Sequence, residues 1–268
     1  MTLHYGDLTA ETDLTWLVAT IKPDELYNLA AQSDVGISFQ IPEYTTQANA
    51  VGVLKILEAV KCFSPKTKVY QASTSELFGN SPAPQNEQTP FNPQSPYAIA
   101  KEYAYRMVKL YRESYGLFTF NGILFNHESP RRGLNFVTRK VSRAVAQIVN
   151  KRLDSLSLGS LDSKRDWGYA PEYCEAMWLM LQQDKPDDYV IGTGETHSIR
   201  ALLFEAFSYV GLEWQDYVKI DPKFVRPLDV YELRADSRKA FMQFGWKPKT
   251  KFKDLVALMV ENDLREIK

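Results

Sequence analysis

Short runs of β-branched and aromatic residues alternate with longer segments of helical period along the first half of the chain. In the clearest helical segment, Val51, Leu54, Leu57 and Val60 recur at spacings of three. Such alternation is typical of βα units wrapped on a parallel sheet. We predict strands at residues 3–5, 25–29, 68–72 and 118–125, and helices at 11–21, 44–62 and 97–115.

The rhythm changes after Gly133, where helical segments prevail over strands. The predicted fold class is α/β, with a doubly wound parallel sheet over residues 1–133 and a smaller mixed α/β portion over residues 134–268. No repeat, low-complexity tract or long linker separates the two portions, so we expect them to pack together. The second portion is predicted to hold helices at 136–151, 171–181, 198–210, 236–244 and 252–266, and strands at 155–158 and 189–191.

The start of the chain departs from the usual opening of such folds. A doubly wound dinucleotide-binding fold begins with a strand, a glycine-rich turn and a helix whose N-terminus receives a pyrophosphate. The one G-x-G in the sequence is Gly192-Thr193-Gly194, with His197 where a third glycine would fall, and it is more typical of a strand-end turn. We therefore expect a sheet that lacks its first two strands.

Charge and cysteine content exclude several classes of protein. Lys and Arg total 32 against 33 Asp and Glu, so a net charge of −1 gives no general attraction to nucleic acid or to an anionic membrane. No apolar run approaches the ~20 residues that span a bilayer, and the N-terminus has no signal-peptide pattern. Cys62 and Cys174 are far apart, which argues against a disulfide framework or a zinc site. We expect a cytoplasmic protein with reduced thiols.

The first candidate for chemistry is the segment from Ser95 to Lys101. Ser95 can cap a helix, Pro96 suits its first turn, and Tyr97 and Lys101 then share one face. An ammonium one turn away favours tyrosinate, so Lys101 is expected to lower the pKa of Tyr97 and make it a general base. The spacing alone is weak, because Tyr105 and Lys109 repeat it and a surface pair explains a bare match.

The second candidate is the polar cluster that contains Thr74, Ser75 and Glu76, directly after a predicted strand. Ligands of open α/β sheets lie beyond the carboxyl ends of the strands, where these side chains would be. A hydroxyl there can polarise a carbonyl while the carboxylate carries a proton. The alternative is a turn in which serine and threonine cap the next segment.

Taken together, these motifs resemble the GDP-mannose 4,6-dehydratases, which are extended short-chain dehydrogenases acting on nucleotide sugars. The T-S-E triplet and the S-P-Y-A-x-x-K helix both match, and matches run from Tyr5 almost to the C-terminus. Further matching stretches are N-L-A-A-Q-S from Asn28, N-G-I-L-F-N-H-E-S-P-R-R-G from Asn121, F-V-T-R-K from Phe136, R-D-W-G from Arg165 and W-L-M-L-Q-Q from Trp178.

The resemblance implies a catalytic role for each matching residue. Tyr97, assisted by Lys101, would remove the proton of the mannose 4-hydroxyl, and Glu76 would take the C5 proton and help expel the C6 hydroxyl as water. Thr74 and Ser75 would hydrogen-bond the reacting oxygens. The implied cofactor is NADP, no metal is required, and the product would be GDP-4-keto-6-deoxy-mannose.

The resemblance also assigns binding residues and an assembly. Residues 1–133 would form a Rossmann-like NADP-binding domain and residues 134–268 would mainly bind the nucleotide sugar, in a homo-oligomer that is a dimer or a tetramer. Residues matching cofactor contacts are Asp7, Leu8, Leu29, Ala30, Ala31, Gln32, Ser33, Tyr44, Lys101, His127 and Arg132. Residues matching GDP-mannose contacts are Asn126, Val137, Lys140, Arg165, Arg226 and Asp229. Outside these sets, we expect Arg131, Arg139, Arg143 and Lys151 to form a solvated basic face, and Trp167 and Trp178 to pack in the core.

Four positions depart from the family pattern: Asp34 and Tyr169 stand where histidine is usual, Gly36 where lysine is usual, and Asp229 where glutamate is usual. The last keeps open a related nucleotide-sugar dehydratase or epimerase. The absence of the glycine-rich turn leads us to expect weak NADP binding and little turnover by this polypeptide alone, so a non-catalytic fragment is the further alternative.

Overall fold

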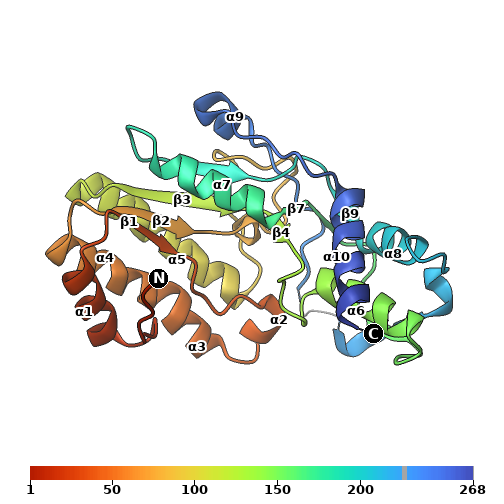
Figure 1. Cartoon of the computed structure of the whole chain (residues 1–268). Coiled ribbons are helices and arrows are strands. Elements are labelled where there is room, and N and C mark those ends of the chain that lie inside the picture. Colours follow the sequence, from red (N-terminus) through yellow and green to blue (C-terminus); the bar gives the residue numbers. More distant parts are fainter. Residues whose placement is uncertain (225–227, 268) are drawn as a thin grey trace.

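A four-stranded parallel sheet forms the centre of the molecule (Figure 1). The computed structural model describes residues 1–224 and 228–267. The strand order is β1-β2-β3-β8, all parallel, which confirms the predicted α/β class. The strands are β1 (Glu25–Asn28), β2 (Lys68–Ala72), β3 (Thr119–Leu124) and β8 (Asp188–Ile191).

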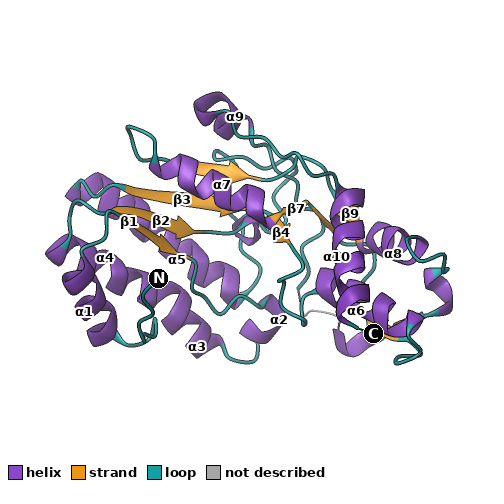
Figure 2. Cartoon of the chain, in the orientation of Figure 1, coloured by secondary structure: helices purple, strands orange, loops and turns teal. Residues whose placement is uncertain are grey.

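Helices cover both faces of this sheet (Figure 2). The two faces are set by alternation within β2, where Val69 packs with one group of helices and Tyr70 packs with another helix on the opposite side. The first group comprises α1 (Glu11–Ile21), α4 (Gly52–Phe63) and α5 (Pro96–Tyr115), and the opposite helix is α7 (Ala170–Leu181). Both α7 and β8 follow residue 133 in the sequence but belong to this sheet and its helical layer. The division of the chain into a cofactor-binding and a sugar-binding portion at residue 133 therefore remains a prediction.

One prediction in the first half was wrong and another was confirmed with a local difference. Residues 3–5 form no strand, since they pair with no strand in the part of the chain that the structure describes, and Leu3 and Tyr5 are exposed. The helix expected at 44–62 is present as a continuous helical segment in which a π-helical stretch, η1 (Gln47–Val51), lies between α3 (Pro42–Thr46) and α4. Asn49 lies within η1, buried, with its side chain hydrogen-bonded at 2.8 Å to both the N–H and the carbonyl of Gln32. The π-helical turn, which is wider than an α-helical turn, is therefore the place where this helix binds the loop after β1.

The second half adds three helices with a core of their own, lying beyond the carboxyl ends of the strands. They are α6 (Val137–Val149), α8 (Ile199–Ser208) and α10 (Phe252–Glu266), the last with the bounds predicted. Three two-stranded pairings accompany them: β4 (Asn126–Glu128) with β7 (Trp167–Tyr169), β6 (Lys164–Arg165) with β9 (His197–Ser198), and β5 (Leu156–Leu158) with β10 (Val218–Ile220). The remaining elements are α2 (Val35–Ser38), α9 (Arg238–Phe244) and the short 3-10 turns η2 (Ser75–Leu77), η3 (Trp214–Asp216) and η4 (Pro222–Phe224).

Two side chains lie where the sequence did not place them. Arg139 is not part of a solvated face: it is buried and pairs with Asp263 at 2.8 Å and Glu266 at 2.9 Å, joining α6 to α10. Trp178 is not in the core, because it lies on the outer side of α7 and is 53% exposed, whereas Trp167 is buried as expected.

Among the described helices, none is long and apolar enough to cross a membrane.

Candidate active site

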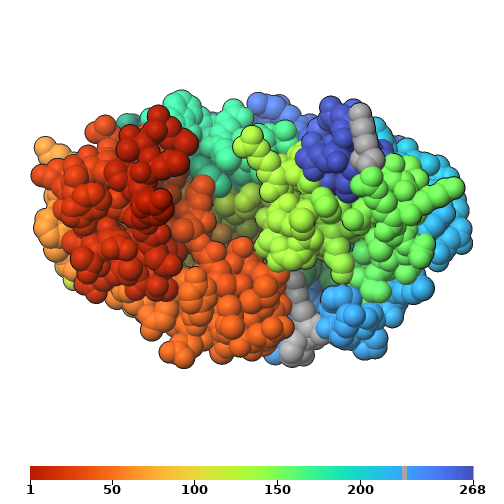
Figure 3. All heavy atoms as spheres, turned by 60° about the horizontal axis from the view of Figure 1, so that its bottom comes forward, coloured from red at the N-terminus to blue at the C-terminus, as the bar shows by residue number. Residues whose placement is uncertain are grey.

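A cavity of about 970 Å³ lies beyond the carboxyl ends of β1, β2 and β3, between the sheet and the second half of the chain. Figure 3 shows the surface hollowed between the N-terminal segment, in red and orange, and the yellow-green segment that leads into α6. The cavity brings together most of the predicted site residues, from widely separated parts of the sequence. Those that line it are Leu29, Ala31, Ser33, Thr74, Ser75, Glu76, Tyr97, Lys101, Asn126, His127, Arg132, Val137, Lys140, Arg165 and Asp229.

The Thr74-Ser75-Glu76 triplet turns directly off the end of β2 into η2. The hydroxyl of Thr74 accepts a hydrogen bond from the N–H of Glu76 at 3.2 Å, so Thr74 caps the turn as the structural alternative predicted. The same hydroxyl lies close enough to the phenol of Tyr97 to lower its pKa. Capping and the candidate catalytic role are therefore compatible, because one hydroxyl can accept one hydrogen bond and donate another.

Tyr97 and Lys101 occupy the first two turns of α5. Ser95 caps this helix by accepting a hydrogen bond from the N–H of Ala98 at 3.1 Å, and Pro96 is its first residue, as the sequence predicted. Both side chains face the cavity and are buried, with the Lys101 ammonium 5.9 Å from the centre of the Tyr97 ring. The other Y-x-x-x-K pair is structural: the phenol of Tyr105 donates to a carboxylate oxygen of Asp188.

The pKa of Tyr97 differs from the expectation. Burial raises it to about 12, the Thr74 hydroxyl lowers it, the charge of Glu76 raises it, and the charge of Arg132 lowers it. The prediction that Lys101 lowers this pKa was wrong for this structure, since burial outweighs an ammonium nearly 6 Å from the ring. Burial also lowers the pKa of Lys101 itself to about 8, and its ammonium donates to the Ala72 carbonyl at 3.0 Å.

His127 is the middle residue of β4, and Arg132 lies in the loop after this strand. The Nδ1–H of His127 donates to the Phe125 carbonyl at 2.9 Å, so Nε2 is left as an acceptor. Burial lowers the pKa of His127, and its ring stacks on Tyr173. The guanidinium of Arg132 lies 3.8 Å from the centre of the Phe136 ring, which holds it flat.

Arg165 forms an ion pair with Glu76. Its Nε lies 3.9 Å from Glu76 Oε1 and its Nη2 lies 3.5 Å from Asp229 Oδ1, while Nη1 donates to the Val230 carbonyl at 2.8 Å. Asp229 also accepts a hydrogen bond from Ser163 at 3.2 Å. Aspartate is one methylene shorter than the glutamate usual in the family, but the Asp229 carboxylate still lies at the cavity wall, where Arg165 of β6 and Ser163 in the loop before it hold it.

Lys140, on the first turns of α6, is partly buried. Its ammonium donates to the Ser157 carbonyl at 2.8 Å and lies 3.9 Å from the centre of the Phe224 ring. Burial and the charge of Lys223 lower its pKa. Asn126 begins β4 and Val137 begins α6, so the three residues matched to GDP-mannose contacts here come from neighbouring segments at one end of the cavity.

Five predicted cofactor residues do not line the cavity, and their roles stay predictions. Asp7 accepts hydrogen bonds from the N–H and hydroxyl of Thr9 at 2.7 Å, and Gln32 bonds Asn49. Leu8 packs beside α4, and Ala30 and Tyr44 are exposed. Arg226 lies outside the described residues.

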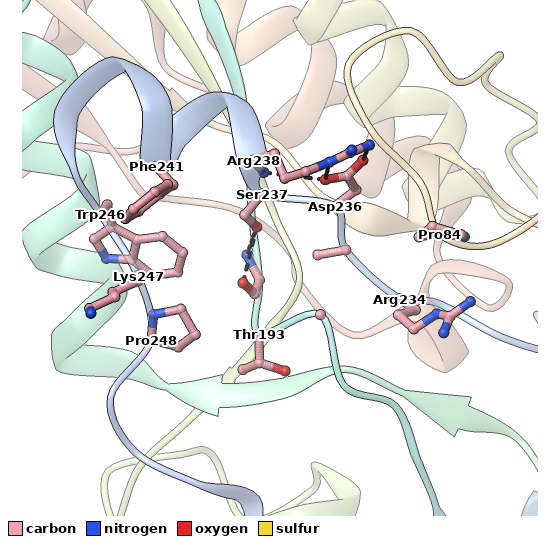
Figure 4. Close-up of a pocket in the computed structure, with 13 residues that line it drawn as sticks. Pro84, Thr193, Arg234, Asp236, Ser237, Arg238, Phe241, Trp246, Lys247 and Pro248 are labelled. Atoms are coloured by element: carbon pink, nitrogen blue, oxygen red, sulfur yellow. Dashed lines mark hydrogen bonds and ion pairs between the residues drawn. The ribbon is translucent and has the colours of Figure 1, made fainter.

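A second, shallower pocket of about 450 Å³ contains none of the predicted site residues (Figure 4). It includes Gly192-Thr193-Gly194, which is a strand-end turn after β8, as predicted. The buried carboxylate of Asp166 accepts hydrogen bonds from the N–H groups of Thr193 and Gly194, both at 2.8 Å. These donors are occupied within the protein, which leaves the turn without the free N–H groups of a phosphate-binding loop.

Sequence reasoning missed several residues at the cavity. Asp34 was noted only as a departure, Thr138 only as part of the F-V-T-R-K stretch, and Asn135 not at all, although all three line it. Glu128 is a buried carboxylate in the cavity wall, and its position inside the N-H-E-S-P-R-R-G run is the signal that would have found it.

Comparison with known proteins agrees with this geometry. The family model described as GDP-mannose 4,6 dehydratase matches residues 1–259. GDP-mannose 4,6 dehydratase 1 of Arabidopsis thaliana is 52% identical, over 98% of this chain and 74% of its own length, and the Homo sapiens GDP-mannose 4,6 dehydratase is 50% identical, over 98% and 76%. A solved NAD complex of UDP-glucose 4-epimerase from Thermus thermophilus superposes with a TM-score of 0.85 at 26% identity, over 96% of this chain and 83% of the other. On this evidence the chain belongs to the GDP-mannose 4,6 dehydratase family.

Proposed function

We propose that this chain binds GDP-mannose and NADP and converts the sugar nucleotide to GDP-4-keto-6-deoxy-mannose. The observation that carries the proposal is the convergence of Thr74, Glu76, Tyr97 and Lys101 on one cavity. Thr74 and Glu76 come from the turn after β2, and Tyr97 and Lys101 come from α5. Two separate segments of the sequence therefore supply the side chains of one site. The names of the relatives at about half identity support the same reaction.

The cavity fits a nicotinamide dinucleotide. At about 970 Å³ it is at the upper end of the range for ligand pockets, so a cofactor and a nucleotide sugar can share it. The Lys101 ammonium uses one donor on Ala72 and has others for ribose hydroxyls, while His127 Nε2 can accept from an amide. The chemistry that such a cofactor supplies when bound is the reversible acceptance of one hydride.

Tyr97 is the proposed base for the sugar 4-hydroxyl. The Thr74 hydroxyl and the charge of Arg132 both lower the pKa of its phenol and so favour the phenolate. A sugar hydroxyl placed against this pair would lose its proton to the phenolate oxygen while Thr74 orients the acceptor.

Glu76 is the proposed proton carrier at C5 and C6. It is on the same turn as Thr74, and its carboxylate faces the Arg165 guanidinium at 3.9 Å. A carboxylate at this place can accept the C5 proton as a general base. The same group would then deliver this proton to the departing C6 hydroxyl, so that one water leaves. The hydride taken from C4 would return to C6, and the proton taken up from the 4-hydroxyl balances the one that C5 regains, which gives the 6-deoxy product.

Arg165 and Lys140 are proposed to hold the GDP portion, with Asn126, Val137, Asp229 and Arg226. A guanidinium fork suits diphosphate oxygens, and local cations are required because the chain has a net charge of −1. NADP as the specific cofactor and a homo-oligomeric state complete the proposal and rest on the sequence resemblance. A cytoplasmic location rests on the number and spacing of the cysteines.

Isothermal titration with GDP-mannose, GDP and UDP-glucose tests substrate choice. Since the chain spans about three quarters of the length of its relatives, binding is measured together with turnover. We expect GDP-mannose and GDP to bind at least about tenfold more tightly than UDP-glucose, and mass spectrometry with NADP present to detect a product lighter by one water. Equal or tighter binding of UDP-glucose would contradict the proposal.

A matched pair of arginine variants controls that titration. Arg165→Lys keeps the charge but loses the fork, so GDP-mannose should bind more weakly by about tenfold. Arg200→Lys, on an exposed arginine paired with Asp162, should bind as the unmodified chain does.

A further inference from the structure

Glu128 is a buried carboxylate that joins the two sides of the cavity. It ends β4, where the parallel ladder pairs it with Tyr169 of β7, and it is 2% exposed. Burying a carboxylate is costly unless cations or donors compensate it. The residues that contact this carboxylate therefore indicate its role.

One oxygen of this carboxylate makes both contacts. Glu128 Oε2 accepts a hydrogen bond from the Thr138 hydroxyl at 2.6 Å and lies 3.2 Å from Arg132 Nε. The second contact is an ion pair without hydrogen-bond geometry, since Arg132 Nε has no hydrogen-bond partner. The same carboxylate oxygen thus contacts both Arg132, which is matched to a cofactor contact, and Thr138 of α6.

The two partners belong to different parts of the candidate site. Arg132 lies in the loop 129–136, flat on the Phe136 ring and close enough to Tyr97 to lower the pKa of the phenol. Thr138 is the second residue of α6, the helix that also presents Val137 and Lys140 to the cavity. Phe136, at the N-cap of α6, makes no side-chain cap, so a carboxylate beside the first turn also meets the favourable end of the helix dipole.

We infer that Glu128 is a positioning residue that sets the Arg132 loop and the first turn of α6 relative to each other, so that the cofactor side and the sugar-nucleotide side of the cavity are coupled through one carboxylate. This inference rests on the proposed function for its ligands. Glu128 needs no contact with either ligand, because it acts through Arg132 and Thr138.

Isothermal titration with GDP-mannose on a double-mutant cycle tests the coupling. Thr138→Val and Glu128→Ala should each weaken binding by about tenfold, and the double variant should bind no more weakly than Glu128→Ala alone, because both changes break the same link. Thr138→Ser, which keeps the hydroxyl, should bind as the unmodified chain does. Losses that add in the double variant, or none in either single variant, would overturn the inference.

Amide hydrogen exchange provides a second readout that needs no ligand. Thr138→Val should speed exchange in residues 129–136, because it removes the hydroxyl that holds the Glu128 carboxylate beside Arg132, while melting stays close to that of the unmodified chain. The matched control is Thr119→Val, a buried threonine of β3 whose hydroxyl donates to Val108, and it should leave exchange in 129–136 unchanged. If the unmodified chain binds no GDP-mannose, the proposed function fails on its own, and unchanged exchange in Thr138→Val overturns the positioning role separately.

Discussion

The carboxylate of Asp34 accepts a hydrogen bond from the side-chain amide of Asn135 at 2.6 Å, across 101 positions of sequence. Both residues line the cavity, Asp34 from the loop after β1 and Asn135 from the loop before α6. The other oxygen of Asp34 caps α2 by accepting from the N–H of Ile37. A residue that departs from the family pattern thus ties the two walls of the cavity together.

Asn135→Asp is expected to open this contact. Two carboxylates would then face each other, and like charges at this distance repel. We expect limited proteolysis within residues 33–41 to become several times faster. In the double variant Asp34→Asn with Asn135→Asp the polarity is exchanged and the cap at position 34 is kept, so proteolysis should return to the original rate. Unchanged cleavage in Asn135→Asp would show that the contact does not hold the loop.

Thr74→Val should shift the pH dependence of turnover upward. The Thr74 hydroxyl lowers the pKa of Tyr97, so its removal leaves the phenol harder to ionise. The rising limb of the rate with pH should move to higher pH, and the maximal rate should fall by roughly tenfold or more. Thr74→Ser keeps the hydroxyl, so it should leave the pH midpoint and the maximal rate close to those of the unmodified chain. Thr46→Val, on an exposed threonine of α3, should change neither quantity. A profile that keeps its midpoint in Thr74→Val would argue against Tyr97 as the base.

Lys101→Met is expected to stabilise the fold at neutral pH and abolish turnover. Burial lowers the pKa of Lys101 from 10.5 to about 8, so between these values the unfolded chain binds more protons and the stability of the unmodified chain rises with pH. Below that window the charged lysine carries its full burial penalty. Replacement should therefore raise the free energy of unfolding by about 2 kcal/mol, allowing for the lost bond to Ala72.

Thermal melts at about pH 7 and about pH 10 check the Lys101 prediction, because the gain should be present at the first and shrink toward the second. Lys109→Met, on the exposed face of the same helix, is the control and should show no such pH dependence. A gain that stays constant across the window would mean that packing rather than charge causes it.

Asp166→Asn should destabilise the protein strongly although it touches no ligand. The carboxylate is fully buried and accepts from two groups of Thr193 and from the N–H groups of Gly194 and Ala235. An asparagine amide keeps one acceptor oxygen and turns a donor toward the remaining N–H groups. We expect urea unfolding to show a loss of about 3 kcal/mol with an unchanged m-value. Asp162→Asn, on an exposed aspartate, should lose less than about 0.5 kcal/mol, and an equal loss in both would refute the argument.

Local sequence signals predicted the elements that depend on neighbours a few residues apart. The Ser95-Pro96 start of α5 and the bounds of α10 followed from capping and helical period, and the parallel sheet followed from the alternation of strands and helices. The position of Thr74 and Glu76 at the end of β2 followed as well, because parallel strands end at one edge of their sheet.

The tertiary structure alone decided what depends on distant residues. It buried Arg139 against α10, placed a π-helical stretch at Asn49 where this side chain binds Gln32, and brought Asp34 to Asn135 and Glu128 to Thr138. It also set the pKa of Tyr97, where burial outweighed the nearby Lys101. Residue spacing along a helix reports which side chains share a face, whereas desolvation and cross-chain contacts arise only when separate segments pack together, and for that reason the sequence identified the reactive groups and the fold determined their environment.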